Sequence, residues 1–311
     1  MSAQILDGTA VAAQIRGQLS TRAAAFTLRA GRQPGLSIVL VGDKADSQIY
    51  VNSKMKSAGD EGMKATLSHL PASASLDEIL SLVRKLNGEP ATDGILVQAP
   101  LPDSLGAGAM QAVFDAIDPS KDVDGVTPVN VGRLVQNRAE LVACTPAGIV
   151  ELLQRSHIEV AGKHAVVIGR SDIVGKPVSM LLLHRHATVT VCHSRTRDLP
   201  AVASTGDILV AAIGRPGFVR RSFVKPGATV IDVGINLVTD AQIARDMFHE
   251  GHPRRGLFER KGSVLVGDVH PEVVEVAGAI TPVPGGVGPL TIAMLMANTI
   301  KAAELRLAGS Q

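Results

Sequence analysis

Two periods of hydrophobic positions alternate along the chain. Continuous β-branched and aliphatic runs predict buried strands at residues 35–42, 63–70, 93–102, 163–169, 187–193, 207–214, 228–235 and 263–269. Apolar residues at helical spacing predict helices at 9–28, 46–59, 75–88, 145–156 and 173–184, and a long helix ends the chain. Strands that alternate with helices in this way predict an α/β protein built from βαβ units with parallel sheets.

Three segments interrupt this alternation. Residues 118–133 are turn-rich and follow neither period, so we expect a boundary loop beside a crevice. Residues 237–262 are charged and less regular, which predicts an excursion at the rim of the second series of strands. The loop 281–291 contains three glycines and three prolines. Because this loop has few large side chains, a flat ligand could approach its backbone. The alternative is a loop that only leads into the following helix and binds no ligand.

Composition argues against several classes of protein. The 311 residues include 31 basic and 29 acidic ones, and 2% are aromatic, which gives no support to a nucleic-acid or anionic-membrane surface. Two cysteines, Cys144 and Cys192, form neither a disulfide framework nor a CxxC motif, which fits a reducing compartment. The N-terminal residues lack a signal-peptide pattern, and the apolar run 287–300 is too short to span a bilayer. We therefore expect a soluble, cytoplasmic protein that binds neither membrane nor nucleic acid.

The sequence VVIGRSDIVGKP, residues 166–177, joins a predicted strand to a predicted helix. Such a turn can bind the pyrophosphate of a dinucleotide on the backbone N–H groups of the helix N-terminus. Its spacing, with Gly169, Ser171, Gly175 and Pro177, differs from GxGxxG. On this fragment alone, an ordinary βα turn that needs a glycine is an equal alternative.

The end of the next strand, CHSRT at 192–196, bears on the choice of nucleotide. NAD-binding folds usually carry an acidic residue here for the ribose 2′-hydroxyl, and this sequence has none. His193, Ser194 and Arg195, together with Arg170, instead offer hydroxyl and guanidinium groups that suit a 2′-phosphate. These residues favour NADP over NAD; the alternative for Arg195 is a solvated surface arginine.

The only tyrosine of the chain, Tyr50, stands four residues before Lys54 in SQIYVNSK, so on a helix the two side chains share one face. Gln98 follows a predicted strand at its carboxyl end, where α/β proteins place their sites, and KDVDG supplies Asp122 and Asp124. A lysine beside amide or phenol groups in a partly dry site can lose its proton near neutrality and act as a general acid or base. Taken singly, each residue could equally be a solvated surface residue or a turn residue with no part in catalysis.

Three histidines raise the question of a metal site. His184 and His186 do not share a helix face, and a histidine in the last turn is stabilised there by the helix dipole. His193 follows the next strand. We expect no metal ion, and we expect Cys144 and Cys192 to pack rather than to act as nucleophiles.

Ten motifs, in order along nearly the whole chain, resemble one family: the bifunctional methylenetetrahydrofolate dehydrogenase/methenyltetrahydrofolate cyclohydrolases, or FolD family. They are SQIYVNSK, GILVQAPLP, KDVDG, CTPAG, GRSDIVGKP, CHSRT, GDILVAAIGRPGF, VIDVGIN, GDV and TPVPGGVGPLT. The resemblance implies two α/β domains around a cleft, the second a Rossmann-like dinucleotide-binding domain with a parallel sheet. It implies a discontinuous folate-binding catalytic domain at 1–143 and 284–311, an NADP-binding domain at 144–283, and a homodimer formed through the latter.

The resemblance also implies roles for single residues. Lys54 is the implied catalytic lysine, Tyr50 and Gln98 shape its surroundings, and Asp124 binds folate. The implied substrate-binding residues are Ser47, Tyr50, Val97, Gln98, Pro100, Leu101, Asp124, Pro282, Gly285, Gly286 and Pro289. The implied cofactor-binding residues are Thr145, Gly169, Arg170, Ser171, Val174, Gly175, Pro177, His193, Ser194, Arg195, Ala212, Gly214, Gly234 and Ile235.

The implied activity is NADP-dependent oxidation of 5,10-methylenetetrahydrofolate to the methenyl form, followed by hydrolysis to 10-formyltetrahydrofolate with the help of Lys54 in a shared site. The chain departs from the family pattern at Asp46, Ala99 and Ala143 and in the length of 237–262, but none of these changes removes a chemical group from the site. The alternatives are a dehydrogenase without the hydrolase and a non-catalytic NADP-binding protein. A hydroxy-acid dehydrogenase would need a His–carboxylate pair, which the sequence does not supply.

Overall fold

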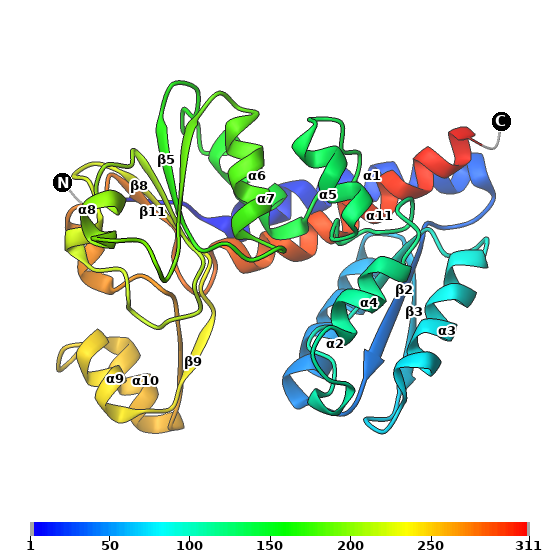
Figure 1. Ribbon diagram of the computed structural model, residues 1–311, viewed down its shortest axis with the longest axis horizontal. Helices are drawn as coiled ribbons and strands as arrows, with labels where there is room; N and C mark the ends of the chain where they lie inside the picture. The colour runs from blue at the N-terminus through cyan, green and yellow to red at the C-terminus, as the bar shows by residue number, and fades with distance from the viewer. Residues whose placement is uncertain (1–2, 310–311) are drawn as a thin grey trace. The chain divides into compact units, whose positions relative to one another are not determined.

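The computed structural model describes residues 3–309 and divides the chain into two compact units (Figure 1). Unit 1 comprises Met1–Ala12 and Thr145–Thr291, and unit 2 comprises Ala13–Cys144 and Ile292–Gln311. Three helices contain the points at which the chain passes from one unit to the other: α1 (Gly8–Ala30), α6 (Cys144–Arg155) and α11 (Val287–Gly309).

Unit 1 is built on a parallel sheet with the strand order β1-β11-β8-β7-β5-β6. Its strands are β1 (Gln4–Ile5), β5 (His164–Ile168), β6 (Thr188–Cys192), β7 (Ile208–Ala211), β8 (Thr229–Asp232) and β11 (Ala279–Ile280). Because β5 pairs with both β6 and β7, the order of the strands reverses at β5. Doubly wound sheets bind ligands at the carboxyl ends of the strands beside such a switch point. The predicted Rossmann-like α/β fold is confirmed.

The middle of this sheet is apolar because both of its faces are covered. Val166, Leu209 and Val230 are fully buried in one core cluster that includes residues from four strands of the sheet. The helices α7 (Gly175–Leu183) and α8 (Leu199–Ala203) follow β5 and β6 along the chain. β6 lies at an edge of the sheet, and Val191 on it is 40% exposed.

The N-terminal strand β1 was not predicted, and neither was its partner β11. Both strands contain only two residues, and they pair in parallel with Gln4 opposite Ala279. The backbone N–H of Thr9 also donates to the carbonyl oxygen of Gly285 at 3.0 Å. The predicted domain limits placed residues 1–12 and 284–291 in the catalytic domain, whereas these contacts assign both segments to unit 1.

Residues 263–269 do not continue the parallel sheet, contrary to the prediction. β10 (Val264–Val266) pairs antiparallel with β9 (Asn236–Val238), and the chain between them forms α9 (Ala241–Met247) and α10 (Pro253–Lys261), the two short helices at the yellow end of Figure 1. This excursion, Asn236–Val266, has its own core. The core residues are Val238, Ala244, Met247, Phe248, Val264 and Val266. The prediction failed because a short apolar run does not reveal which strand it will pair with.

Unit 2 contains a parallel sheet with the order β3-β2-β4. Its strands are β2 (Gly35–Val41), β3 (Lys64–Leu70) and β4 (Gly94–Val97), and its other helices are α2 (Ala45–Asp60), α3 (Leu76–Gly88), α4 (Ala109–Ala116) and α5 (Pro128–Val135). The central strand β2 is buried at every residue, whereas β3 at the edge is not. α3 begins with a capping box in which Ser75 and Glu78 satisfy each other's backbone N–H groups.

The predicted loop at 118–133 is partly helical. Thr127 accepts a hydrogen bond from the backbone N–H of Asn130, and Pro128 occupies the first turn, so the Thr-Pro pair starts α5. The helix α4 was also not predicted. The remainder of the segment, through Asp122 and Asp124, is irregular and lies between these helices.

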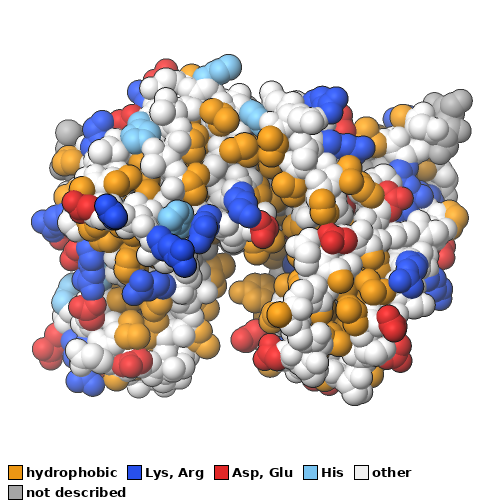
Figure 2. Space-filling model, in the orientation of Figure 1, with side chains coloured by type: hydrophobic (Ala, Val, Ile, Leu, Met, Phe, Trp, Pro, Cys, Tyr) orange, Lys and Arg blue, Asp and Glu red, His pale blue; other side chains and the backbone are white. Residues whose placement is uncertain are grey.

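The surface carries charges of both signs. On the face in Figure 2, basic and acidic side chains are interspersed among apolar and neutral ones. No helix within residues 3–309 combines the length and the apolar character needed to cross a membrane. This face gives no support to a continuous basic surface for nucleic acid.

Candidate active site

Lys54 and Gln98 meet in unit 2. Lys54 lies on α2, and Gln98 directly follows β4, at the carboxyl end of the sheet. The Lys54 Nζ atom donates a hydrogen bond of 2.8 Å to Gln98 Oε1. The Gln98 Nε2 atom donates to the carbonyl oxygen of Ala99 at 2.7 Å. Both ends of the amide are therefore engaged, and its oxygen faces the amine.

Tyr50 stands one turn before Lys54 on α2, as the spacing predicted. Tyr50 is 44% exposed and Lys54 is half-buried. Lys56 has a side chain that is 79% exposed, and it pairs with Asp60 at 3.3 Å. Tyr50 and Lys54 therefore lie on the same face of α2, as predicted, and Lys56 lies outside that face.

The two aspartates of KDVDG have different surroundings. Asp122 is fully buried and accepts hydrogen bonds from Thr127 and Asn130 and from backbone N–H groups of the loop, so it builds the turn. Asp124 is half-buried, and its charge acts on Lys54. Asp124, and not Asp122, therefore belongs with the lysine.

A buried amide on α11 holds this loop in place. The Asn298 Nδ2 atom donates to the carbonyl oxygens of Val123 and Val142, at 2.8 Å each. The Cys144 thiol donates to the same Val123 oxygen at 3.2 Å. Cys144 is buried, as expected of a packing residue. The sequence analysis missed Asn298, although a lone amide in the apolar stretch MLMANTI was an available signal.

Burial is the largest influence on the pKa values of Lys54, Asp124 and Cys144. It lowers the pKa of Lys54, and the charge of Asp124 opposes that shift. It raises the pKa of Asp124, and the charge of Lys54 opposes that shift in turn. Burial, aided by the charge of Asp124, also raises the pKa of the Cys144 thiol well above its usual value. Burial therefore favours the thiol form of Cys144 and the neutral amine of Lys54.

The other predicted substrate-binding residues of unit 2 lie on α2 or follow β4. Ser47 is buried on α2, and Val97 is the buried last residue of β4. Pro100 is exposed and Leu101 is buried in the loop after Gln98. The structure thus brings this part of the predicted set to one edge of the sheet of unit 2.

The turn after β5 in unit 1 is closed too tightly for side chains. Gly169 has φ 131°, and a Cβ atom there would lie 2.2 Å from the carbonyl oxygen of Ala212. A Cβ atom on Gly175, at the start of α7, would lie 2.2 Å from the carbonyl oxygen of Gly169. The Ser171 hydroxyl accepts from the backbone N–H groups of Val174 and Gly175 at 3.2 and 3.3 Å. The turn therefore brings bare backbone to the N-terminus of α7, as a pyrophosphate site requires.

The turn after β6 is fixed by its own hydrogen bonds. The His193 N–H donates to Thr196 Oγ1 at 2.9 Å, and the Arg195 N–H donates to His193 Nδ1 at 3.1 Å. His193 is thus half-buried in the turn, whereas Ser194, Arg195 and Arg170 are exposed. Among residues 3–309, no cluster of three or more His, Cys, Asp or Glu side chains is placed to hold a metal ion.

A buried carboxylate shapes the turn after β7. Asp268 accepts from the backbone N–H groups of Ile213, Gly214 and Arg215 at 2.7, 3.0 and 2.8 Å. Together with the carbonyl of Ala212 that covers Gly169, this places the turns after β5 and β7 side by side at the switch point. The sequence analysis included GDV among its motifs but assigned Asp268 no role.

A second carboxylate supports the loop after β8. Asp232 is buried and accepts from the N–H groups of Gly234, Asp268 and Val269 at 3.0, 2.8 and 3.0 Å. Burial raises the pKa of Asp232 to about 7. The three backbone N–H donors favour the ionised form of Asp232 and so oppose the effect of burial on its pKa. The same three hydrogen bonds hold the loop in place.

A cavity of about 140 Å³ joins two groups of predicted residues within unit 1. Gly234 and Ile235 line it from the loop after β8. Pro282, Gly285, Gly286 and Pro289 line it from the loop that leads into α11. Of the remaining predicted residues, Thr145 shares a hydrogen bond of 2.8 Å with Thr291, and Pro177 is buried in α7. The structure therefore gathers the unit 1 residues around the carboxyl ends of β5 to β8 and the loop into α11.

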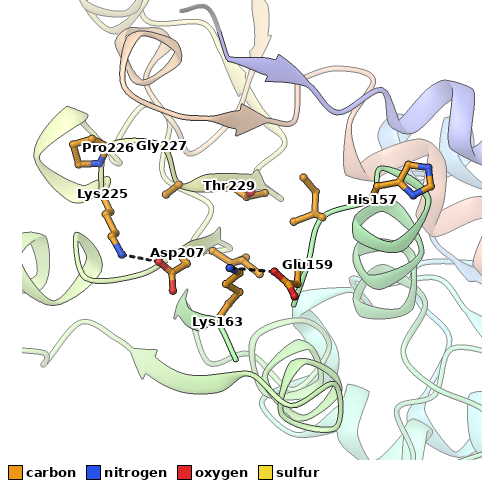
Figure 3. Close-up of a pocket in the computed structure, with 11 residues that line it drawn as sticks. His157, Glu159, Lys163, Asp207, Lys225, Pro226, Gly227 and Thr229 are labelled. Carbon is orange, nitrogen blue, oxygen red and sulfur yellow. Dashed lines mark hydrogen bonds and ion pairs between the residues drawn. The ribbon is translucent and has the colours of Figure 1, made fainter. Parts of the chain in front are cut away.

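At the amino ends of its strands, the sheet of unit 1 borders a different hollow, of about 320 Å³, which is shown in Figure 3. It lies where Lys163 precedes β5, Asp207 precedes β7 and Thr229 begins β8. Lys225 pairs with Asp207 at 2.6 Å, and Lys163 pairs with Glu159 at 3.3 Å. Its charges are paired within the hollow, and it contains none of the predicted site residues.

Comparisons with known proteins agree with this arrangement. Residues 6–124 match the family described as "Tetrahydrofolate dehydrogenase/cyclohydrolase, catalytic domain", and residues 143–307 match "Tetrahydrofolate dehydrogenase/cyclohydrolase, NAD(P)-binding domain". A relative from Koribacter versatilis (strain Ellin345), "Bifunctional protein FolD", is 53% identical over 306 residues and covers 98% of each chain.

Two solved structures extend the comparison. The bifunctional FolD enzyme of Campylobacter jejuni is 39% identical with a TM-score of 0.86, over 98% of this chain and 100% of that one. The Trypanosoma brucei enzyme, solved with NADP cofactor and an inhibitor, is 40% identical with a TM-score of 0.86 over 99% of each chain.

The fold and these matches define a nucleotide-binding α/β enzyme. The chain belongs to the tetrahydrofolate dehydrogenase/cyclohydrolase family. It is a bifunctional enzyme of folate one-carbon chemistry, with methylenetetrahydrofolate dehydrogenase and methenyltetrahydrofolate cyclohydrolase activities. The predicted family and enzyme class are therefore confirmed, and the non-catalytic alternative is set aside.

Proposed function

We propose that the protein oxidises 5,10-methylenetetrahydrofolate with NADP⁺ and hydrolyses the methenyl product to 10-formyltetrahydrofolate, and that Lys54 moves the protons of the hydrolysis. The observation that carries the proposal is the 2.8 Å hydrogen bond from Lys54 Nζ to Gln98 Oε1, on a half-buried face where burial lowers the pKa of the lysine. Both reactions would use one folate held by the residues around this pair.

The residues at the switch point fit a dinucleotide. Gly169 and Gly175 let the backbone of the turn pack closely, because a Cβ atom at either position would meet a carbonyl oxygen, and the turn so formed leads into the N-terminus of α7, where a pyrophosphate would bind. Ser194, Arg195 and Arg170 are exposed after β6 and β5, and they offer hydroxyl and guanidinium groups that suit a 2′-phosphate. The Trypanosoma brucei relative was solved with NADP, which also supports NADP as the cofactor of this chain. When bound, NADP⁺ supplies a nicotinamide ring that accepts a hydride.

The protein's own part in the oxidation is to bind and orient the folate. Asp124 would accept hydrogen bonds from N–H groups of the folate ring, and Tyr50 and Val97 would border it. Within unit 1, the loop with Gly285 and Gly286 would present its backbone to a ligand, because it lines the cavity of about 140 Å³ with few side chains. Fixing both partners of the transfer supplies the proximity that this step requires.

The hydrolysis requires two proton movements. Water adds to the methenyl carbon and loses a proton, and the departing ring nitrogen gains one. Lys54, whose pKa is lowered by burial, would take the first proton as a neutral amine and deliver the second as an ammonium. Gln98 accepts from the amine through a neutral oxygen, so it orients Lys54 without fixing its charge. Loss of hydride leaves a cationic methenyl group, which further disfavours an ammonium beside it.

We also propose a homodimer that forms through unit 1 and a cytoplasmic location. β6 is an edge strand of the parallel sheet and exposes Val191. Unpaired edge strands are common sites of association. Both cysteines are free and buried, which suits a reducing compartment. Light scattering at micromolar concentration tests the dimer: twice the chain mass supports it, and a single chain mass refutes it.

One spectrophotometric experiment tests the activity. Purified protein is mixed with 5,10-methylenetetrahydrofolate and NADP⁺, with NAD⁺ in a parallel cuvette, and the reduced nucleotide is followed. Acid then converts any 10-formyl product back to the methenyl form for counting. NADP-dependent turnover with formyl product supports the proposal. Turnover that stops at the methenyl form indicates a dehydrogenase alone, and nucleotide binding without turnover contradicts the mechanism.

A further inference from the structure

The excursion Asn236–Val266 contacts the loop 282–286 through one arginine. Arg254, on α10, donates from Nη1 to the carbonyl oxygen of Val283 and from Nη2 to that of Leu265. Its guanidinium carbon lies 5.3 Å from the centre of the Phe248 ring. Arg254 is half-buried, and its hydrogen-bond acceptors here are carbonyl oxygens rather than carboxylates. A guanidinium used in this way joins β10 to the loop at two defined points.

The loop 282–286 lies between two hollows. On one side, Pro282, Val283 and Gly285 line the cavity of about 140 Å³ that also contains Ile235. On the other side, Pro282 and Val283 line a hollow of about 260 Å³ that reaches Phe248 and Arg254 in the excursion. Open space on both sides would let the loop shift, so its position depends on the hydrogen bonds that hold it, from Thr9 to the Gly285 carbonyl oxygen and from Arg254 to that of Val283.

The excursion is itself firm enough to provide that attachment. Phe248 is buried in the core of the excursion, and His252 stacks on it with ring centres 4.8 Å apart. His252 caps α10 by accepting from the Arg254 N–H at 3.1 Å. His270, outside the excursion, shares a hydrogen bond of 3.0 Å with the carbonyl oxygen of Asp246. Arg254 therefore starts from a helix that is capped, packed and tied to the rest of unit 1.

We propose that the excursion braces the loop 282–286 and that Arg254 is a positioning residue for the dehydrogenase reaction. Arg254 acts through the Val283 carbonyl, since it holds the backbone of the loop whose Gly285 and Gly286 line the cavity of about 140 Å³ in unit 1. The inference rests on the proposed function for the identity of the ligand, but the brace itself concerns only the loop.

The first test measures the loop without any substrate. Arg254→Met keeps an unbranched side chain against Phe248 and removes both hydrogen bonds. Hydrogen–deuterium exchange of the backbone amides at 285–288 is expected to quicken at least tenfold, while that of strands β5 to β8 stays unchanged. Arg260→Met is the matched control, since Arg260 is an exposed arginine on the same helix. Exchange at 285–288 that equals that of the wild type would overturn the brace.

The second test measures catalysis in the same variants. The KM for 5,10-methylenetetrahydrofolate should rise about tenfold in Arg254→Met, which corresponds to ~1.4 kcal/mol, the scale of one hydrogen bond to a charged donor. The Kd for NADP⁺ should change by less than about twofold, because the 2′-phosphate and pyrophosphate residues lie elsewhere. Arg254→Lys keeps the charge but has a single donor nitrogen, so its KM should lie between those of the wild type and Arg254→Met. An unchanged KM with normal folding refutes the positioning role.

These readouts separate two failures. If the wild-type protein turns over no folate, the proposed function fails, but the exchange experiment still decides whether Arg254 braces the loop. If turnover is normal and Arg254→Met changes neither exchange nor KM, the brace alone fails. If Arg254→Met does not fold, Arg254→Lys carries both measurements and is judged by the same criteria.

Discussion

The Lys54 Nζ atom donates to Gln98 Oε1 at 2.8 Å, although the two residues stand 44 positions apart in the chain. A neutral amide oxygen satisfies the amine without the charge that a carboxylate would supply. An adjacent carboxylate would hold the lysine protonated, whereas burial beside an amide favours its neutral form. The charge of the Asp124 carboxylate acts on Lys54, and it opposes the effect of burial on the pKa of the lysine. Burial and the charge of Asp124 thus act on the pKa of Lys54 in opposite directions.

The pH dependence of hydrolysis tests this balance. A general base loses activity as pH falls through its pKa, so the acid limb of cyclohydrolase kcat reports Lys54. Asp124→Asn removes the charge that raises the pKa of Lys54, so the limb should move to lower pH. The measurement is kcat against pH, with Asp115→Asn as an exposed control on α4. A limb that stays in place, or moves to higher pH, would contradict the assignment.

Glu61, just after α2, should make stability depend on pH. It is 2% exposed, neither carboxylate oxygen has a hydrogen-bond partner in the described part of the chain, and Arg16 Nε lies 4.0 Å away. Burial raises its pKa to about 7. Between the usual carboxyl pKa and about 7, the folded state keeps a proton that the unfolded state has lost, so stability falls as pH rises through this window, by up to ~3 kcal/mol.

Glu61→Gln should remove that penalty. We expect the variant to exceed the wild type in free energy of unfolding by about 1–3 kcal/mol at pH 8, and to differ little at pH 5. Urea unfolding at both pH values is the measurement, and Asp60→Asn is the exposed neighbour that controls for loss of a charge. Equal changes at the two pH values would show that Glu61 does not titrate in this window.

Gly175→Ala should disrupt nucleotide binding. The new Cβ atom would lie 2.2 Å from the Gly169 carbonyl oxygen, so the turn would have to open at the pyrophosphate position. We expect the Kd for NADP⁺ to rise at least about tenfold and stability to fall by about 1–3 kcal/mol. In Gly256→Ala the nearest atom is the flexible end of Arg260 at 3.4 Å, so that control should bind normally. Normal binding by Gly175→Ala would place the pyrophosphate elsewhere.

Ser194→Asp tests the choice of nucleotide. A carboxylate in the turn after β6 would accept from a ribose 2′-hydroxyl and would repel a 2′-phosphate. The ratio of kcat/KM for NADP⁺ to that for NAD⁺ should fall by about tenfold or more, which is the scale of one charge-assisted hydrogen bond. The same change at the half-buried Ser204 in unit 1, whose hydroxyl donates to the carbonyl oxygen of Ala201, should leave the ratio unaltered. Were the ratio unchanged in Ser194→Asp, this turn would not read the 2′-position.

Much of the fold could be predicted because buried parallel strands form continuous apolar runs. β2, β5, β7 and β8 each lie within such a run and were located to within a few residues. β1 and β11 could not be located in this way, because a two-residue strand has no period and is defined only by its partner. β10 illustrates a related limit, since its run was visible but the direction of its pairing was not.

In the candidate site too, features set by neighbouring residues in the sequence could be predicted, whereas those set by contacts between distant residues could not. Tyr50 and Lys54 could be paired from helical spacing, and Gln98 could be placed from its position after a strand. The choice between Asp122 and Asp124 depends on which carboxylate the loop itself uses, and only the hydrogen bonds of Asp122 reveal that. The role of Arg254 could not be predicted either. Its acceptors are backbone carbonyl oxygens, whose positions cannot be read from the sequence.

The account depends most directly on the amine of Lys54. Cyclohydrolase activity should therefore be measured in Lys54→Met, with Lys56→Met, on the exposed side of the same helix, as the control. We expect the rate of methenyltetrahydrofolate hydrolysis to fall by about 10²–10⁴-fold in Lys54→Met, which is the usual contribution of a general acid or base, and to stay near wild type in Lys56→Met. Undiminished hydrolysis by folded Lys54→Met would contradict the account.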